Sequence, residues 1–166
     1  MKSTVIIFGT LGGNTRVIAK RINEALGGSA KVIDVNMSTA ADFQDYDNII
    51  LGTSTTGYGE LIDPWIDFMP TINGIELNGK TVALFGLGDS SSFSDTFTNG
   101  MAELYTVMQE KGANIIGSVS TEGYTFDDSK SVVDGRFVGL ALDEDNEDSQ
   151  TPQRIKDWVA IISPQL

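Results

Sequence analysis

The chain has 166 residues, 40% of them hydrophobic, and a formal net charge of −12. This length and composition favour one folded domain spanning residues 1–166 over a disordered chain, and no apolar run is long enough to cross a bilayer. The negative charge argues against binding to nucleic acid or to an acidic membrane surface and favours basic protein partners.

The sequence contains no cysteine and no histidine. Disulfides, thiolate nucleophiles, iron–sulfur ligation, the usual zinc sites and imidazole acid–base catalysis are therefore excluded. We expect no metal site, and we expect any chemistry to be supplied by a cofactor. The first residues lead directly into an apolar strand pattern and leave no room for a signal peptide, so the sequence predicts a cytoplasmic protein.

Apolar strand patterns alternate with amphipathic helical patterns along the chain. Strands are predicted at residues 4–8, 31–35, 48–53, 81–85, 114–119 and 137–142. Helices are predicted at residues 15–26 and 63–69, in a long segment ending at Lys111, and after Thr151-Pro152. This alternation predicts a doubly wound α/β sheet with helices on both faces. The polar segment at residues 120–136 is predicted to be an insertion, because strand character resumes after it.

The loop after the first strand, residues 8–15, is rich in glycine and hydroxyl groups and runs directly into a helix. Backbone N–H groups at a helix start bind anions, most often phosphate. Thr10 and Thr15 add hydroxyl donors, and Gly12 and Gly13 allow a sharp turn. The loop lacks the lysine of a nucleoside-triphosphate loop and the glycine spacing of a dinucleotide site. By itself it fits either a phosphate site or a plain capped turn.

Two further loops with small and hydroxyl side chains follow the third and fourth strands, at residues 54–60 and 86–93. In a doubly wound sheet, ligands lie beyond the carboxyl ends of the strands. We therefore expect the three loops to form one site, with a phosphate at residues 10–15 and a flat group between the other two loops. Most of the acidic run at residues 143–148 is expected to be a solvated loop.

Five segments carry a family pattern, and they lie at residues 8–16, 59–61, 79–89, 120–124 and 135–146. Together they resemble the long-chain flavodoxin family over essentially the whole chain. The last segment is the most specific, and it lies just after the insertion that distinguishes long-chain members. The resemblance implies a five-stranded parallel sheet in the order 2-1-3-4-5 with an interrupted fifth strand. It also implies a low-potential one-electron carrier with non-covalently bound FMN, which is not an enzyme.

The resemblance also assigns the cofactor-binding residues. The first loop would hold the phosphate, and the isoalloxazine ring would lie between the second and third loops, stacked on Phe93 and with Asp145 nearby. Gly57 would let the peptide between it and Tyr58 turn toward reduced flavin, which predicts a stable neutral semiquinone. The assigned residues are Thr10, Leu11, Gly12, Gly13, Asn14, Thr15, Ser54, Thr55, Thr56, Gly57, Tyr58, Gly59, Leu87, Gly88, Asp89, Phe93 and Asp145.

Three of these residues differ from the usual family pattern. Gly12 stands where Ser or Thr is usual, Thr56 where many members have Trp, and Phe93 where Tyr is usual. The first change removes one phosphate hydroxyl, the second removes a stacking ring, and the third keeps the stacking face but loses its hydroxyl.

The resemblance further implies a monomer that docks transiently with basic redox partners on an acidic face near the flavin. A flavodoxin reductase or a photosynthetic donor would supply electrons, and an acceptor enzyme such as nitrogenase would receive them. Asp89 and Asp145 would lower the flavin potential by repulsion.

Two alternatives stay open. One is a flavodoxin-like, FMN-dependent NAD(P)H:quinone reductase, although the chain shows no added sequence for a nicotinamide or quinone pocket. The other is a module without flavin, either a structural relative or a receiver-type domain. A receiver needs an acidic cluster at strand ends, whereas the first strand here ends in Phe8-Gly9-Thr10.

Overall fold

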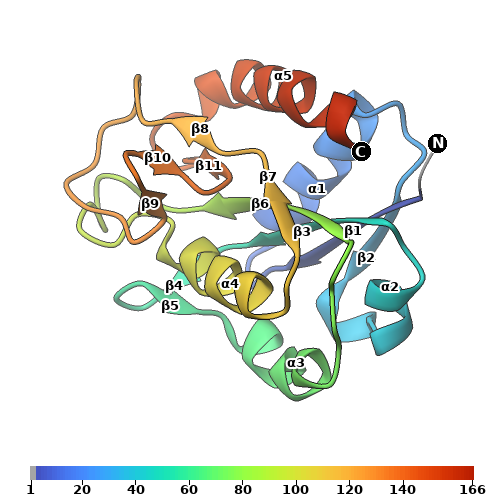
Figure 1. Ribbon diagram of the computed structural model, residues 1–166. Helices are drawn as coiled ribbons and strands as arrows, with labels where there is room; N and C mark the ends of the chain where they lie inside the picture. Colours follow the sequence, from blue (N-terminus) through green and yellow to red (C-terminus); the bar gives the residue numbers. More distant parts are fainter. Residues whose placement is uncertain (1–2) are drawn as a thin grey trace.

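The computed structural model describes residues 3–166 as a central sheet with helices on both faces (Figure 1). The strands run in the order β2-β1-β3-β6, and β7 and β11 both pair with the outer edge of β6. Every pairing among them is parallel. The strands are β1 (Thr4–Gly9), β2 (Lys31–Asp34), β3 (Asn48–Thr53), β6 (Thr81–Leu87), β7 (Asn114–Ile116) and β11 (Leu140–Leu142).

The fifth position of the sheet is shared by two strands. Thr81 in the first half of β6 pairs with Asn114 of β7, and Phe85 in the second half pairs with Leu140 of β11. The predicted order 2-1-3-4-5 with an interrupted fifth strand is therefore confirmed.

The chain between β7 and β11 forms a separate antiparallel sheet in the order β8-β10-β9. These strands are β8 (Val119–Ser120), β9 (Val132–Val133) and β10 (Arg136–Phe137). Ser120 pairs with Arg136, so the two ends of the predicted insertion lie side by side.

Two glycines explain why the strands at this edge are shorter than predicted. The strand expected to reach residue 119 ends at Ile116, because Gly117 has a φ of +87° and its carbonyl accepts a hydrogen bond of 2.8 Å from the Trp158 indole. The strand expected at residues 137–142 is divided at Gly139. A Cβ there would lie 2.1 Å from the Leu84 carbonyl oxygen.

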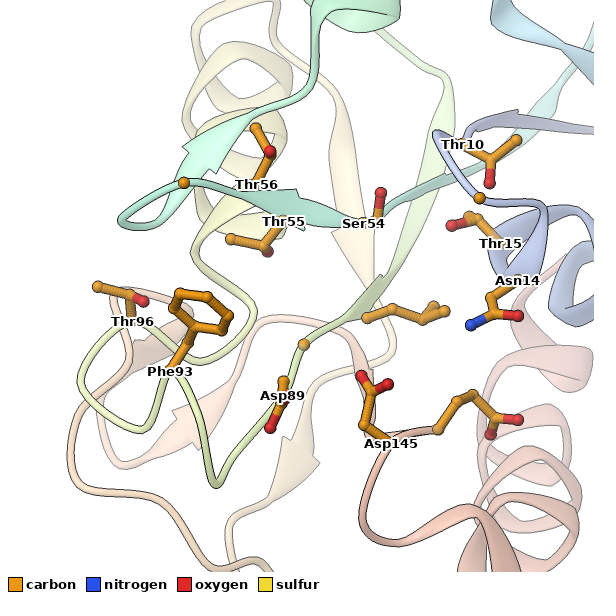
Figure 2. A pocket seen from close by; sticks show the side chains of 15 residues that line it. Thr10, Asn14, Thr15, Ser54, Thr55, Thr56, Asp89, Phe93, Thr96 and Asp145 are labelled. Carbon is orange, nitrogen blue, oxygen red and sulfur yellow. The ribbon is translucent and has the colours of Figure 1, made fainter.

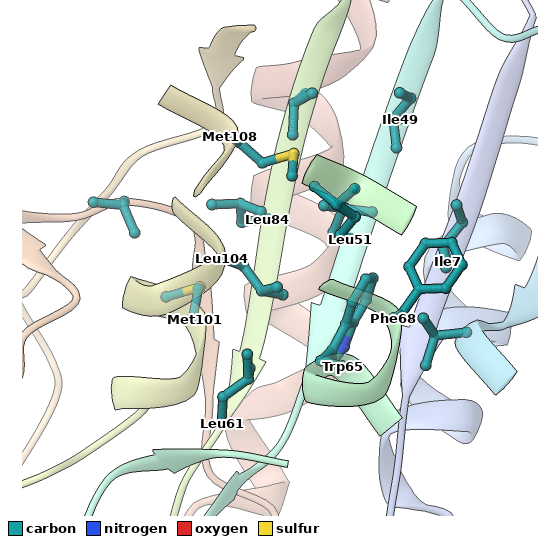
Figure 3. Packing of buried hydrophobic residues seen from close by; sticks show 14 of the residues in the cluster. Ile7, Ile49, Leu51, Leu61, Trp65, Phe68, Leu84, Met101, Leu104 and Met108 are labelled. Atoms are coloured by element: carbon teal, nitrogen blue, oxygen red, sulfur yellow. The ribbon is translucent and has the colours of Figure 1, made fainter. Parts of the chain in front are cut away.

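Helices cover both faces of the sheet. One face carries α1 (Asn14–Ala25) and α5 (Thr151–Ile162), and the other carries α3 (Asp63–Asn73) and α4 (Asn99–Glu110). Figure 3 shows part of the second layer, where α3 and α4 pack on β1, β3 and β6. The shorter elements are α2 (Ala40–Gln44), the β4 (Thr55–Thr56) and β5 (Glu60–Leu61) hairpin, and 3-10 turns at Val35–Met37, Asp148–Gln150 and Ser163–Gln165.

The central strands are buried on both faces. In β1, Val5 and Ile7 belong to the core beneath α3 and α4, while Ile6 and Phe8 belong to the core beneath α1 and α5. This alternation follows from the two-residue period of a strand, and it explains the continuous apolar sequence of β1.

The predicted end of the second helix is wrong, since α3 runs through Pro70 to Asn73. Its apolar face continues beyond the proline, because Ile72 is fully buried. Within residues 3–166, no helix combines the length and apolar character needed to span a bilayer.

Candidate functional site

A cavity of about 320 Å³ lies where the chain leaves β1, β3, β6 and β11 (Figure 2). The three predicted loops all contribute to it, and a fourth loop, which follows β11, completes the wall. The lining residues are Thr10, Gly12, Asn14, Thr15, Ser54, Thr55, Thr56, Gly57, Leu87, Gly88, Asp89, Phe93, Thr96, Glu144 and Asp145.

The first loop turns sharply into α1. Gly13 has a φ of +95°, and its N–H donates to the Thr10 hydroxyl oxygen at 2.8 Å. The Thr10 oxygen is thus an acceptor inside the loop, which leaves its own hydrogen free to donate into the cavity. The helix start adds backbone N–H groups that have no partner within the helix.

Thr15 provides the clearest sign that the cavity binds a ligand. Its side chain is fully buried, it lines the cavity, and its hydroxyl has no hydrogen-bond partner among residues 3–166. An unpaired buried hydroxyl costs about 1–3 kcal/mol, so such groups are rare in folded proteins. A ligand oxygen at the positive end of α1 would satisfy this hydroxyl, and the donor set fits a phosphate.

The basic residue nearest this loop faces elsewhere. Arg16 donates to the Asp34 carboxylate at 3.1 Å, and its guanidinium lies 4.9 Å from the centre of the Phe8 ring. Arg16 is also not one of the residues that line the cavity. The first loop therefore offers an anion neutral hydrogen-bond donors and the α1 dipole.

The second loop is a short hairpin between β4 and β5. Two glycines with positive φ, Gly57 at +53° and Gly59 at +87°, form its turn. Tyr58 at the tip is 87% exposed and lies outside the cavity lining. Gly59 packs against α4, where a Cβ would come within 2.7 Å of the Asn99 amide nitrogen.

The third loop is organised by Asp89. One carboxylate oxygen of Asp89 accepts from the backbone N–H groups of Ser91 at 3.1 Å and Ser92 at 2.9 Å. The Ser92 N–H is the main reason why the pKa of Asp89 lies below its usual value. The Phe93 N–H donates to the Asp89 carbonyl at 2.9 Å, and this bond places the Phe93 ring at the cavity rim.

The fourth loop brings two acidic side chains to the cavity, Glu144 and Asp145. Partial burial raises the pKa of Asp145, and the carboxylates of Asp89, Asp143 and Glu144 raise it further. The hydroxyl of Thr151, at the start of α5, donates a hydrogen bond to the Glu144 carboxylate. This side of the cavity is therefore rich in negative charge.

Most of the predicted site residues do line the cavity. Four do not: Leu11 and Tyr58 are exposed, while Gly13 and Gly59 shape the turns behind the lining. Two lining residues, Thr96 and Glu144, were not predicted. Glu144 could have been found as the neighbour of Asp145. Thr96 lies in an irregular segment before α4 that carries no motif.

A doubly wound parallel sheet in the order 2-1-3-4-5, with a phosphate-type helix start and a cavity formed by loops at its carboxyl edge, is the architecture of flavodoxin-like proteins. The family model described as Flavodoxin matches residues 6–158. Flavodoxin 1 of Escherichia coli K12 is 42% identical over 168 residues, covering 100% of this chain and 96% of the relative. Flavodoxin of Synechocystis is 40% identical, covering 97% and 96%. The chain belongs to the flavodoxin family.

Solved structures agree with this assignment. The crystal structure of Fusobacterium nucleatum flavodoxin bound to flavin mononucleotide has a TM-score of 0.94 and 33% identity, covering 100% of this chain and 99% of that one. Oxidised Flavodoxin 1 of Bacillus cereus has a TM-score of 0.70 and 26% identity, with coverage of 96% and 97%.

Proposed function

We propose that this chain is a one-electron carrier that works with a non-covalently bound FMN. The observation that carries the proposal is the buried, unpaired Thr15 hydroxyl, which lines a cavity at the start of α1 in a member of the flavodoxin family. When bound, FMN supplies the one-electron oxidation and reduction, and the protein supplies binding, orientation and electrostatics.

The residues divide by role. Thr10, Thr15 and the backbone of the first loop would hold the phosphate, since they offer donors and no competing carboxylate. The flat ring would lie between the second and third loops, with Thr56 on one loop and Phe93 on the other. The carboxylates of Asp89 and Asp145 would oppose negative charge on the reduced ring and so favour donation of its electron.

The chain would exchange electrons with a donor and with an acceptor in turn. Its net charge of −12 favours basic partners, whose association would be faster at low ionic strength. We further propose that such partners dock on the acidic face around Asp89 and Asp145. A reductase or a photosynthetic donor would supply the electron, and an acceptor enzyme such as nitrogenase would receive it.

We also propose that residues 1–166 form one domain of the long-chain type. Supporting this, the segment between β7 and β11 packs its own aromatic side chains, Tyr124, Phe126 and Phe137, against Phe97, which precedes α4. The segment is thus continuous with the core beneath α4 rather than a separate unit.

The test is an anaerobic reductive titration of the purified chain with added FMN, followed by visible absorbance. We expect tight uptake of flavin and a long-lived one-electron-reduced form with long-wavelength absorbance. Reduction directly to the two-electron state would contradict the one-electron carrier. Failure to take up FMN would overturn the proposal as a whole.

A further inference from the structure

Asp143 is a carboxylate with no exposed surface, and it lies directly after β11. One of its oxygens accepts from the backbone N–H of Ser90 at 3.1 Å and from the Ser90 hydroxyl. The other accepts from the N–H groups of Asp145 at 3.1 Å and Asn146 at 3.0 Å. All of these partners are donors, which matches the acceptor-only chemistry of a carboxylate.

The bonds between Asp143 and Ser90 connect the two chains just beyond the paired ends of β6 and β11. Leu87, the last residue of β6, pairs with Leu142, the last residue of β11, and the Gly88 N–H donates to the Leu142 carbonyl at 3.0 Å. One step later both chains leave the sheet. There the side chain of Asp143 joins them, by binding Ser90 on the opposite chain.

Asn146 adds a second connection between the same loops. Its amide nitrogen donates to Asp143 at 3.1 Å and to Asp89 at 2.8 Å. The same Asp89 carboxylate fixes the turn that places Phe93. Asp143 is therefore linked to that turn by two routes, one through Ser90 and one through Asn146 and Asp89.

We propose that Asp143 is a positioning residue for the cavity, acting together with Ser90. It sets the spacing between the turn that carries Phe93 and the loop that carries Glu144 and Asp145, without itself lining the cavity. Where this concerns FMN, it rests on the proposed function. Both of these walls line the cavity, so a ligand that contacts both requires that they keep one fixed separation.

The substitution Asp143→Asn keeps the shape and replaces one acceptor oxygen by an amide donor. That donor would face the donors of Ser90 or those of the fourth loop, so at least one buried group is left unpaired. We expect the dissociation constant for FMN to rise about tenfold or more, because an unpaired buried donor would let the two loops leave the separation that the bound form requires. Ser90→Ala removes only the hydroxyl donor, and we expect a smaller rise of about threefold.

Asp127→Asn is the matched control. Asp127 also accepts from a serine hydroxyl in the segment before α4, that of Ser94 at 2.8 Å, but it is exposed and lies outside the cavity. We expect this variant to bind FMN within about twofold of the unmodified chain, because exposed polar pairs contribute little.

Two further measurements separate positioning from general stability and from charge. Amide hydrogen exchange of the chain without FMN should accelerate at Ser90 and Asn146 in Asp143→Asn, while the amides of β1 and β3 keep their protection. The midpoint potential of bound flavin should rise in Asp143→Asn, which removes a negative charge, and stay unchanged in Ser90→Ala, which does not.

The proposal is overturned if Asp143→Asn matches Asp127→Asn in FMN affinity, or if faster loop exchange leaves the affinity unchanged. Should Asp143→Asn fail to fold, Ser90→Ala decides the question by the same affinity and exchange measurements. If the unmodified chain takes up no FMN, the proposed function fails. The exchange measurement then still decides whether Asp143 holds the two loops together.

Discussion

The Thr55 hydroxyl oxygen accepts a hydrogen bond of 3.1 Å from the backbone N–H of Gly100, which lies in the first turn of α4. An N–H at this position has no partner within the helix, and Thr98, which precedes α4, provides no side-chain cap. The second cavity loop thus caps the start of α4, although Thr55 and Gly100 are 45 residues apart in the sequence. A Cβ on Gly100 would lie 2.7 Å from the Ser54 carbonyl oxygen, so the contact is also close in space.

Thr55→Val should therefore destabilise the chain without FMN. Valine has the same shape but no acceptor, and leaving the Gly100 N–H unpaired costs about 1–3 kcal/mol of unfolding free energy. Thr55→Ser keeps the acceptor and should cost less, on the order of 0.8 kcal/mol for the lost methyl group. Urea unfolding of the three proteins measures the difference. Equal losses in both variants would show that the hydroxyl does not cap α4.

Thr15→Val should produce effects of opposite sign on stability and on binding. Without ligand, the variant removes a buried hydroxyl that lacks a partner, so the unfolding free energy should stay equal or rise by about 1 kcal/mol. With FMN, the loss of a donor to a charged phosphate should weaken binding by about 1.5–3 kcal/mol, or roughly 10- to 150-fold.

Riboflavin provides the control for Thr15, because it carries the same ring without the phosphate. Its affinity should be the same for Thr15→Val and for the unmodified chain, as measured by fluorescence titration. An equal loss for FMN and riboflavin would contradict a phosphate role for Thr15.

The sheet and the position of the cavity could be predicted because both depend on local patterns. The apolar runs at Thr4–Gly9, Asn48–Thr53 and Thr81–Leu87 are buried on both faces, and each is followed by a glycine- or hydroxyl-rich loop. In a parallel sheet such loops must gather at one edge. The alternation of strand and helix patterns, together with the composition of the loops, was therefore sufficient to predict the sheet and the position of the cavity.

The details of the walls depend on contacts between distant parts of the chain. The acidic run at residues 143–148 was expected to be mostly solvated, and Asp148 is indeed exposed, but Asp143 is fully buried. Its burial depends in part on Ser90, 53 residues away, which donates to it through its backbone N–H and its hydroxyl. The exposure of Tyr58 also depends on a contact between distant parts of the chain, because it follows from how the β4–β5 hairpin packs against α4. No local pattern carries this information.

Asp145 should make the chain less stable as the pH rises. Its pKa in the folded state is raised, so between its unfolded value, near 3.9, and the raised value, the folded state binds more protons than the unfolded state. Stability therefore falls as the pH rises through the raised pKa. We expect Asp145→Asn to be more stable than the unmodified chain at neutral pH, with the difference disappearing below about pH 4.

The pKa of Asp89 is shifted in the opposite direction, so its effect on the pH dependence of stability is opposite to that of Asp145. Its pKa is lowered by backbone donors, so its contribution is present above the unfolded pKa and is lost as the pH falls through the lowered value. Asp89→Asn should be less stable than the unmodified chain at neutral pH. Thermal unfolding without FMN across the acidic range tests both variants, and identical pH profiles for the two would contradict this assignment.

Tyr124 links the segment between β7 and β11 to α5 and to the end of the sheet. Its hydroxyl donates to the Ala141 carbonyl at 2.7 Å, and the Arg154 guanidinium lies 3.8 Å from its ring centre. Burial raises the pKa of Tyr124 to about 12, although Arg154 acts in the opposite direction. Because an unfolded tyrosine ionises near pH 10, the folded state binds more protons between about pH 10 and 12, and stability should fall across this range.

Tyr124→Phe should abolish this alkaline loss while lowering stability at neutral pH by about 1 kcal/mol, because one buried hydrogen bond is removed. The ultraviolet absorbance of tyrosinate measures the ionisation directly, and its step near pH 12 should be absent in Tyr124→Phe. Arg154→Met should move the step to higher pH, because the guanidinium favours the ionised phenol. A step near pH 10 in the unmodified chain that disappears in Tyr124→Phe would show that the Tyr124 hydroxyl is solvated and that this segment does not pack against β11 as described.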